Sequence, residues 1–236
     1  MNLLGSLFHS SIGKKFLMAL TGLVLVGFVT GHLVGNLQIF LPPAKINAYG
    51  HMLESLGAGL WAIRVFLLAC VVIHIWLAFK LTAENRAARP QDYGVGHTNR
   101  ATLASRIMLR SGIVVLVFLV YHLWHFTLRV QHPEWSEHTF RLADGTMVRD
   151  VYRMAVQGFS SAGISFFYIL GVGLLAYHLN HGLVSMFQSF GLKNERWTVG
   201  LERASLAYCW LYFLGNAAIP LAVLGWPPFL GGLIQR

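Results

Sequence analysis

Five apolar segments, each long enough to cross a lipid bilayer, dominate this sequence. They cover residues 16 to 41, 59 to 83, 106 to 130, 155 to 190 and 203 to 226, with approximate ends. A helix needs about 20 apolar residues to cross roughly 30 Å of hydrocarbon. The sequence therefore predicts an all-α integral membrane bundle of five transmembrane helices, which forms a single domain over residues 1 to 236.

The composition supports a membrane protein and argues against several soluble classes. Only 11% of the residues are charged, whereas an ordinary soluble domain contains about 25%. The net charge of +9 does not indicate nucleic-acid binding, because the sequence has no basic run interleaved with aromatic residues. Cys70 and Cys209 lie inside apolar segments without CxxC spacing, so we expect buried thiols rather than a disulfide framework or a zinc site.

The basic residues are distributed unequally between the two sides of the predicted bundle. Eleven Lys and Arg residues belong to the side with the N-terminus and the connections 84 to 105 and 191 to 202, and seven belong to the other side. Loops rich in Lys and Arg generally stay in the cytoplasm. We therefore expect a multi-pass protein of the cell inner (cytoplasmic) membrane, with its N-terminus in the cytoplasm.

Histidines occur inside four of the five apolar segments. They are His32, His74, His122, His125, His178 and His181. An imidazole at lipid depth is costly and normally faces the interior of a bundle. Any one of them can be an ordinary hydrogen-bonded core residue, but their presence in four helices indicates a shared purpose.

Two of these histidines are expected at the same depth near the outer face. His32 follows Lys15 by 17 residues, and His122 follows Arg106 by 16 residues. At a rise of about 1.5 Å per residue, both lie roughly 25 Å from the cytoplasmic end of their helices.

The remaining histidines define a second level nearer the cytoplasm. His74 precedes Lys80 by six residues, and His178 and His181 precede Lys193 by 15 and 12 residues. Two levels with two ligands each match the requirement of two haems, because an iron porphyrin takes one ligand above and one below its plane. Small residues beside the ligands would make room for the macrocycle; they are Gly27, Gly31, Gly35, Cys70, Ala78 and Gly182.

Several motifs resemble those of a known membrane-protein family. They are SSIGKKFLMALTGL at 10 to 23, GHLVGN at 31 to 36, NAYGHMLES at 47 to 55, VIHIWLAF at 72 to 79, FLVYHLWHF at 118 to 126 and YHLNHGLVSMFQSFG at 177 to 191. Together they resemble the diheme cytochrome b membrane-anchor subunit of succinate dehydrogenase and fumarate reductase, in its single-chain, five-helix form. The resemblance covers essentially the whole chain.

The resemblance implies two haem b groups with iron ligands from alternating helices. His32 and His122 would ligate the outer haem, and His74 and His178 the inner one. This pairing agrees with the two depths.

Each doubled histidine leaves a choice of ligand. The family pattern His-x-x-x-Gly favours His178 with Gly182, although depth slightly favours His181. The family's His-Leu pair favours His122 over His125. The alternates, His125 and His181, are expected to hydrogen-bond a haem propionate or a neighbouring helix, or to be ordinary core histidines.

Basic residues near the helix ends are candidate partners of the haem propionates. Lys80, Arg106 and Arg110 are candidates for the inner haem, and Arg129 for the outer one. The alternative for each is that its charged end reaches the membrane interface while its stem lies along the helix.

The resemblance also implies an electron-transfer role with two partners on the cytoplasmic side, a flavoprotein subunit and an iron–sulfur subunit. The chain itself has no GxGxxG fingerprint and no Cys cluster, so we do not expect it to oxidise succinate. Electrons would pass between the iron–sulfur subunit, the inner haem, the outer haem and a membrane quinone. The family suggests menaquinone.

A quinone site is predicted in the first outer connection. Glu54 is the only acidic residue there, and Asn47, Tyr49 and His51 lie close to it in the sequence. These groups can hydrogen-bond ring oxygens and carry protons. The alternative is a solvated loop carboxylate.

Two other functions compete with this hypothesis. The first is a cytochrome b subunit of another respiratory complex, and the second is a haem-free transporter whose histidines line a proton or metal path.

Overall fold

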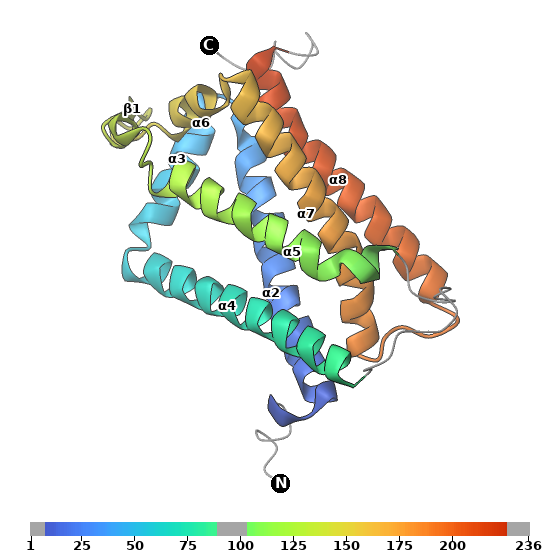
Figure 1. Ribbon diagram of the computed structural model, residues 1–236. Coiled ribbons are helices and arrows are strands. Elements are labelled where there is room, and N and C mark those ends of the chain that lie inside the picture. Colours follow the sequence, from blue (N-terminus) through green and yellow to red (C-terminus); the bar gives the residue numbers. More distant parts are fainter. Residues whose placement is uncertain (1–7, 89–102, 226–236) are drawn as a thin grey trace. The chain divides into compact units, whose positions relative to one another are not determined.

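The structure is a computed structural model that describes residues 8–88 and 103–225, with the side chains of 103–107 left out. It is almost entirely helical (Figure 1). Its α-helices are α2 (Ser11–Asn36), α3 (Pro43–Ser55), α4 (Ala58–Ala87), α5 (Leu103–His122), α6 (Val151–Phe159), α7 (Ala162–Ser189) and α8 (Thr198–Leu224). Shorter elements are the 3₁₀ turns η1 (Leu37–Phe40) and η3 (Pro133–Ser136), the π-helical turn η2 (Leu123–Thr127), and the strands β1 (Thr139–Arg141) and β2 (Met147–Arg149).

Five of these helices are long and apolar enough to cross a membrane, which confirms the predicted fold class. Their spans are Ser11–Phe40, Ala58–Ala87, Met108–Thr127, Ala162–Ser189 and Thr198–Leu224. Only 11–39% of the most apolar window in each span is buried inside the protein. Exposed apolar faces of this extent are compatible with lipid and not with water. The chain is therefore a multi-pass membrane protein.

The predicted fourth segment, 155 to 190, is two helices rather than one over-long helix. α6 ends at Phe159 and α7 begins at Ala162. The serines at this junction bind the terminal carbonyls of α6: Ser160 Oγ donates to Gln157 O and Ser165 Oγ donates to Phe159 O, both at 2.7 Å. These two carbonyls therefore gain hydroxyl donors where the helix ends.

The predicted outer connections also contain regular structure. α3 occupies most of residues 42 to 58, with Pro43 in its first turn, a position that proline favours because its nitrogen needs no acceptor there. β1 and β2 form an antiparallel hairpin in which Phe140 pairs with Val148. Gly145 in its turn has a φ of 87°, a conformation that glycine adopts readily.

The protein contains two compact units. Unit 1 contains the described residues of Met1–Phe28, Arg64–Ile113 and Leu175–Cys209. Unit 2 contains those of Val29–Ile63, Val114–Leu174 and Trp210–Arg236. Each long helix contributes residues to both units, and the single-domain organisation stays a prediction.

Unit 2 has an apolar core where α3 and α6 pack together. Figure 1 shows these two helices next to the hairpin. The buried members of the core are Ile39, Ile46, Tyr152, Ile219, Ala222 and Val223. Asp150 caps α6 by accepting a hydrogen bond from Arg153 N, which satisfies a free amide at the start of that helix.

Gly171 allows α7 to approach α5 closely within unit 2. A Cβ atom at Gly171 would lie only 2.3 Å from Cδ2 of Phe118. Phe118 in turn lies one helical turn before His122, and the two ring centres are 6.3 Å apart. The missing side chain at Gly171 therefore helps to set the position of His122.

We expect Gly171→Ala to lower the free energy of unfolding by about 1–3 kcal/mol, the usual effect of forcing extra volume into a packed interior. Thermal unfolding in detergent measures this loss. The matched control is Gly200→Ala in α8, where a Cβ would meet nothing within 4 Å. An equal melting temperature for the two variants would contradict the close packing inferred at Gly171.

Candidate functional site

His32 and His122 lie close together in unit 2. His32 lies in α2 and His122 is the last residue of α5; their ring centres are 5.7 Å apart and their planes make an angle of 84°. Metal–imidazole bonds are about 2 Å long, so two rings on opposite sides of one metal have centres roughly 6 Å apart. The observed spacing fits a pair of axial ligands, and each ring can rotate about its own metal bond, so the angle is compatible as well.

The surface beside His32 has room for a large group. His32 is exposed, and a Cβ atom at Gly31 would meet nothing within 4 Å. A Cβ at Gly35 would instead lie 2.7 Å from Cε1 of Tyr49. The role of Gly31 beside a macrocycle stays a prediction, whereas Gly35 makes space for the ring of Tyr49.

His125 has different surroundings from His122. It lies in the π-helical turn, where Leu128 N donates to Leu123 O, and it is 1% exposed. Its Nδ1 lies 3.0 Å from the hydroxyl of Tyr168, and its Nε2 has no hydrogen-bond partner among the residues that the structure describes. His122 rather than His125 contacts His32, which favours His122 as the partner ligand.

His74 and His178 are the second predicted pair, and both belong to unit 1. They lie in α4 and α7. Each Nδ1 is 3.2 Å from a hydroxyl oxygen on another helix: Thr21 Oγ1 for His74 and Ser111 Oγ for His178. These contacts leave the opposite nitrogen, Nε2, as the atom that can bind a metal.

His181 hydrogen-bonds within its own helix. Its Nε2 lies 3.2 Å from Oγ of Ser185, which is one turn further along α7. This nitrogen is therefore already engaged, and the geometry favours His178 over His181 as a ligand.

The predicted propionate partners are in varied surroundings. Lys80 is half exposed, with its Nζ 3.7 Å from Glu84 Oε1, while the buried Lys14 contacts the same carboxylate at 2.5 Å. Arg110 is exposed, and the side chain of Arg106 lies outside the described residues. Arg129 follows the π-helical turn and has a φ of 53°. This is the left-handed backbone region, which residues other than glycine rarely adopt.

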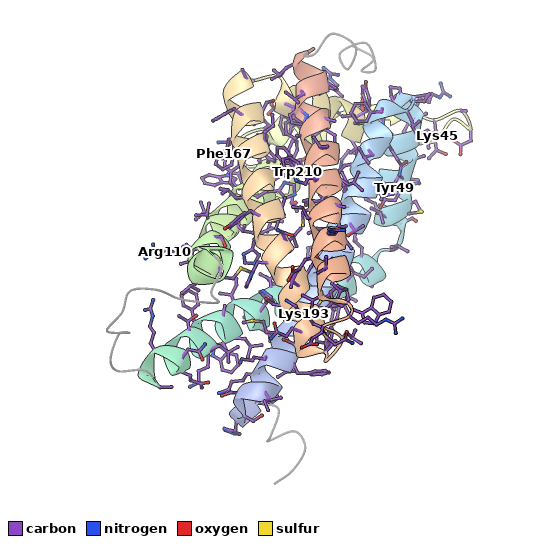
Figure 2. All side chains as sticks on the ribbon, turned by 90° about the vertical axis from the view of Figure 1, so that its right-hand side faces the viewer. Lys45, Tyr49, Arg110, Phe167, Lys193 and Trp210 are labelled. Atoms are coloured by element: carbon purple, nitrogen blue, oxygen red, sulfur yellow. The ribbon has the colours of Figure 1, made fainter. Side chains whose placement is uncertain are left out.

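Of the four predicted quinone-site residues, Tyr49 lines a cavity of the described structure. A cavity of about 150 Å³ is lined by residues that include His32, Gly35, Asn36, Tyr49, Leu53 and Val151. Tyr49 is one turn beyond Lys45 in α3 (Figure 2). His51 is exposed, and Glu54 forms an ion pair with Arg149 at 3.1 Å.

Asn47 is fully buried and does not line that cavity. Its Oδ1 accepts from Tyr152 N at 2.9 Å, and its Nδ2 donates to Asp150 Oδ1 at 3.1 Å. Both the oxygen and the nitrogen of the side-chain amide therefore join α3 to the start of α6. This structural role was not visible in the sequence, because its partners lie more than 100 residues away.

Sequence reasoning also missed Thr21, Ser111 and the buried position of Lys14. The hydroxyls follow no local motif of metal ligands, and only the pairing of helices brings them to the histidines.

Among the described residues, no group of three or more His, Cys, Asp or Glu side chains could hold a metal ion. A haem iron needs only two protein ligands, since the porphyrin supplies the others.

We expect Asn47→Ala to lower the free energy of unfolding by about 1–3 kcal/mol, because it removes the acceptor of the buried Tyr152 N–H. Detergent melting curves measure the change. Asn216→Ala serves as the control, since the Asn216 amide donates to Tyr212 O within α8. Equal melting temperatures for the two variants would show that the link between α3 and α6 adds no more stability than the hydrogen bond of Asn216.

Comparisons with known proteins gave no match: no family model, no curated protein and no solved structure matches this chain.

Proposed function

We propose that this chain is the diheme cytochrome b membrane-anchor subunit of a succinate:quinone oxidoreductase, of the succinate dehydrogenase or fumarate reductase type. The pairing of four histidines on membrane-spanning helices carries this proposal. His32 and His122 have the spacing of two axial ligands, and Nδ1 of both His74 and His178 lies within hydrogen-bonding distance of a hydroxyl on another helix. The resemblance of the sequence motifs to the family is the basis for proposing which complex the chain belongs to.

Each histidine pair would hold one haem iron. When bound, a b-type haem takes up and releases one electron at a time. The chain's own residues orient the rings and keep them among apolar helices. Lys80 is a candidate partner of a haem carboxylate, because Glu84 is already paired more closely with Lys14. Arg106, Arg110 and Arg129 are the further candidates.

The cavity beside His32 is the proposed site for the quinone ring. Its volume is about 150 Å³, and an apolar cavity of that volume holds one benzene ring, so it would receive one of the two fused rings of a naphthoquinone. The ring of Tyr49 lines it, and a phenolic hydroxyl can donate to a quinone oxygen. Glu54, close by in α3 and paired with Arg149, is the proposed proton-carrying group. The proposed substrate is menaquinone.

The chain lies in the inner (cytoplasmic) membrane with its N-terminus in the cytoplasm, as the bias of basic residues supports. A flavoprotein subunit and an iron–sulfur subunit bind on the cytoplasmic side and carry out succinate chemistry. The chain itself transfers electrons and reacts with quinone.

The test is a reduced-minus-oxidised spectrum of the purified protein, with quantification of its haem. We expect two haems b per chain. His32→Ala and His122→Ala should each remove the same haem, and His74→Ala and His178→Ala the other, because an iron that loses an axial ligand is held less tightly.

His125→Ala and His181→Ala are the matched controls and should keep both haems. A wild-type protein without b-type haem would contradict the proposal and favour a haem-free transporter. Haem without a co-purifying flavoprotein would favour a cytochrome b of another respiratory complex. Retention of both haems in all four ligand variants would show that the ligand set is wrong.

We expect Tyr49→Phe to reduce the quinone-dependent rate about tenfold while haem content is unchanged, because one hydrogen bond to the ring is lost. The rate is measured with a menaquinone analogue on the purified complex. Lys45→Gln, one turn earlier in α3 and exposed, is the control. An unchanged rate in Tyr49→Phe would remove this hydroxyl from the quinone site.

A further inference from the structure

Two hydroxyl–glycine pairs lie against the inner histidines of unit 1. Thr21 and Gly22 are consecutive in α2 and face His74, while Ser111 and Gly112 are consecutive in α5 and face His178. Both hydroxyl residues are 8% exposed. The same two-residue arrangement thus occurs on two helices, each time against one member of the same histidine pair.

The hydrogen bonds of Thr21 define which atoms carry protons. Its Oγ1 lies 3.0 Å from Leu17 O and from Met18 O. Carbonyl oxygens can only accept, so the single proton of the hydroxyl is directed to its own helix. Thr21 therefore accepts from Nδ1–H of His74, and the backbone of Met18 is a second acceptor for the same ring.

Ser111 has the same arrangement. Its Oγ donates to Met108 O at 2.9 Å and lies 3.2 Å from Nδ1 of His178. The lone pair of this oxygen is left for the Nδ1–H of the imidazole. Both histidines are consequently in the tautomer with a proton on Nδ1 and a free lone pair on Nε2.

The two glycines allow each ring to lie against the neighbouring helix. A Cβ at Gly22 would lie 3.6 Å from Cε1 of His74, and a Cβ at Gly112 would lie 3.3 Å from Cε1 of His178. The second distance is tighter than most real contacts, so a side chain there would displace the ring. Close approach therefore brings each Nδ1 within hydrogen-bonding distance of its hydroxyl.

We propose that Thr21 and Ser111 are positioning residues for the inner haem, which present Nε2 of His74 and of His178 to the iron and lower its midpoint potential. This inference rests on the proposed haem-binding function. An imidazole that donates a hydrogen bond from Nδ1 is a more basic ligand. A more basic ligand stabilises the oxidised iron relative to the reduced iron, and second-shell hydrogen bonding is one of the protein's means of tuning a haem.

The variants Thr21→Val and Ser111→Ala remove the hydroxyls, and Thr21→Ser keeps one. Thr82→Val is the matched control, because Thr82 Oγ1 donates to Ala78 O in α4 in the same unit. The measurement is a potentiometric titration of both haems in the purified complex, with haem content determined by spectrum. We expect a positive shift for one haem in Thr21→Val and in Ser111→Ala, no shift for the other haem, and wild-type behaviour in Thr21→Ser and Thr82→Val.

The outcomes separate this inference from the proposed function. Two haems with potentials equal to those of Thr82→Val would overturn the inference and leave the function standing, whereas a wild-type protein without haem would overturn both. If Thr21→Val loses the inner haem, restoration in Thr21→Ser supports the role of the hydroxyl. Continued loss in Thr21→Ser overturns it.

Discussion

Polar groups at lipid depth must find partners within the protein, and this constraint governs the arrangement of the membrane helices. Water does not supply hydrogen bonds there, so an unpaired imidazole nitrogen is costly. In unit 1, His74 and His178 use hydroxyls from neighbouring helices, and His181 uses a serine of its own helix. In unit 2, His125 uses the hydroxyl of Tyr168. His74, His178 and His125 use Nδ1, whereas His181 uses Nε2. The hydrogen bonds therefore separate His181 from the candidate ligands, and His125 is separated by the packing of His122 against His32.

The fold of unit 2 places its cavity next to a histidine by combining a short helix with buried polar contacts. Asn47 joins α3 to the first turn of α6, and the apolar core lies around Ile46 and Tyr152. With α3 held in this way, Tyr49 can approach Gly35 of α2. The cavity therefore depends on residues that do not line it, and Asn47 is one of them.

The sequence was sufficient to predict the five membrane helices, because long apolar runs report directly on burial in lipid. It was not sufficient for α3, which is short and begins at a proline, or for the break between α6 and α7, which depends on serine hydroxyls and not on a change in hydropathy. The histidines could be grouped by depth, since helix rise is constant. The roles of Thr21, Ser111 and Asn47 could not be predicted, because each depends on a partner from a distant helix.

The two similar stretches YHLWHF and YHLNHG illustrate this limit. In an ordinary α-helix, residues three apart lie about 60° apart around the axis, so both histidines of a pair should share a face. In the first stretch a π-helical turn begins directly after His122, so His122 contacts His32 while His125 packs beside Tyr168 and Trp135. The second stretch stays α-helical, and its two histidines differ in their hydrogen bonds: Nδ1 of His178 contacts Ser111 and Nε2 of His181 contacts Ser185. One sequence pattern is therefore resolved in two physical ways, by backbone geometry in α5 and by side-chain partners in α7.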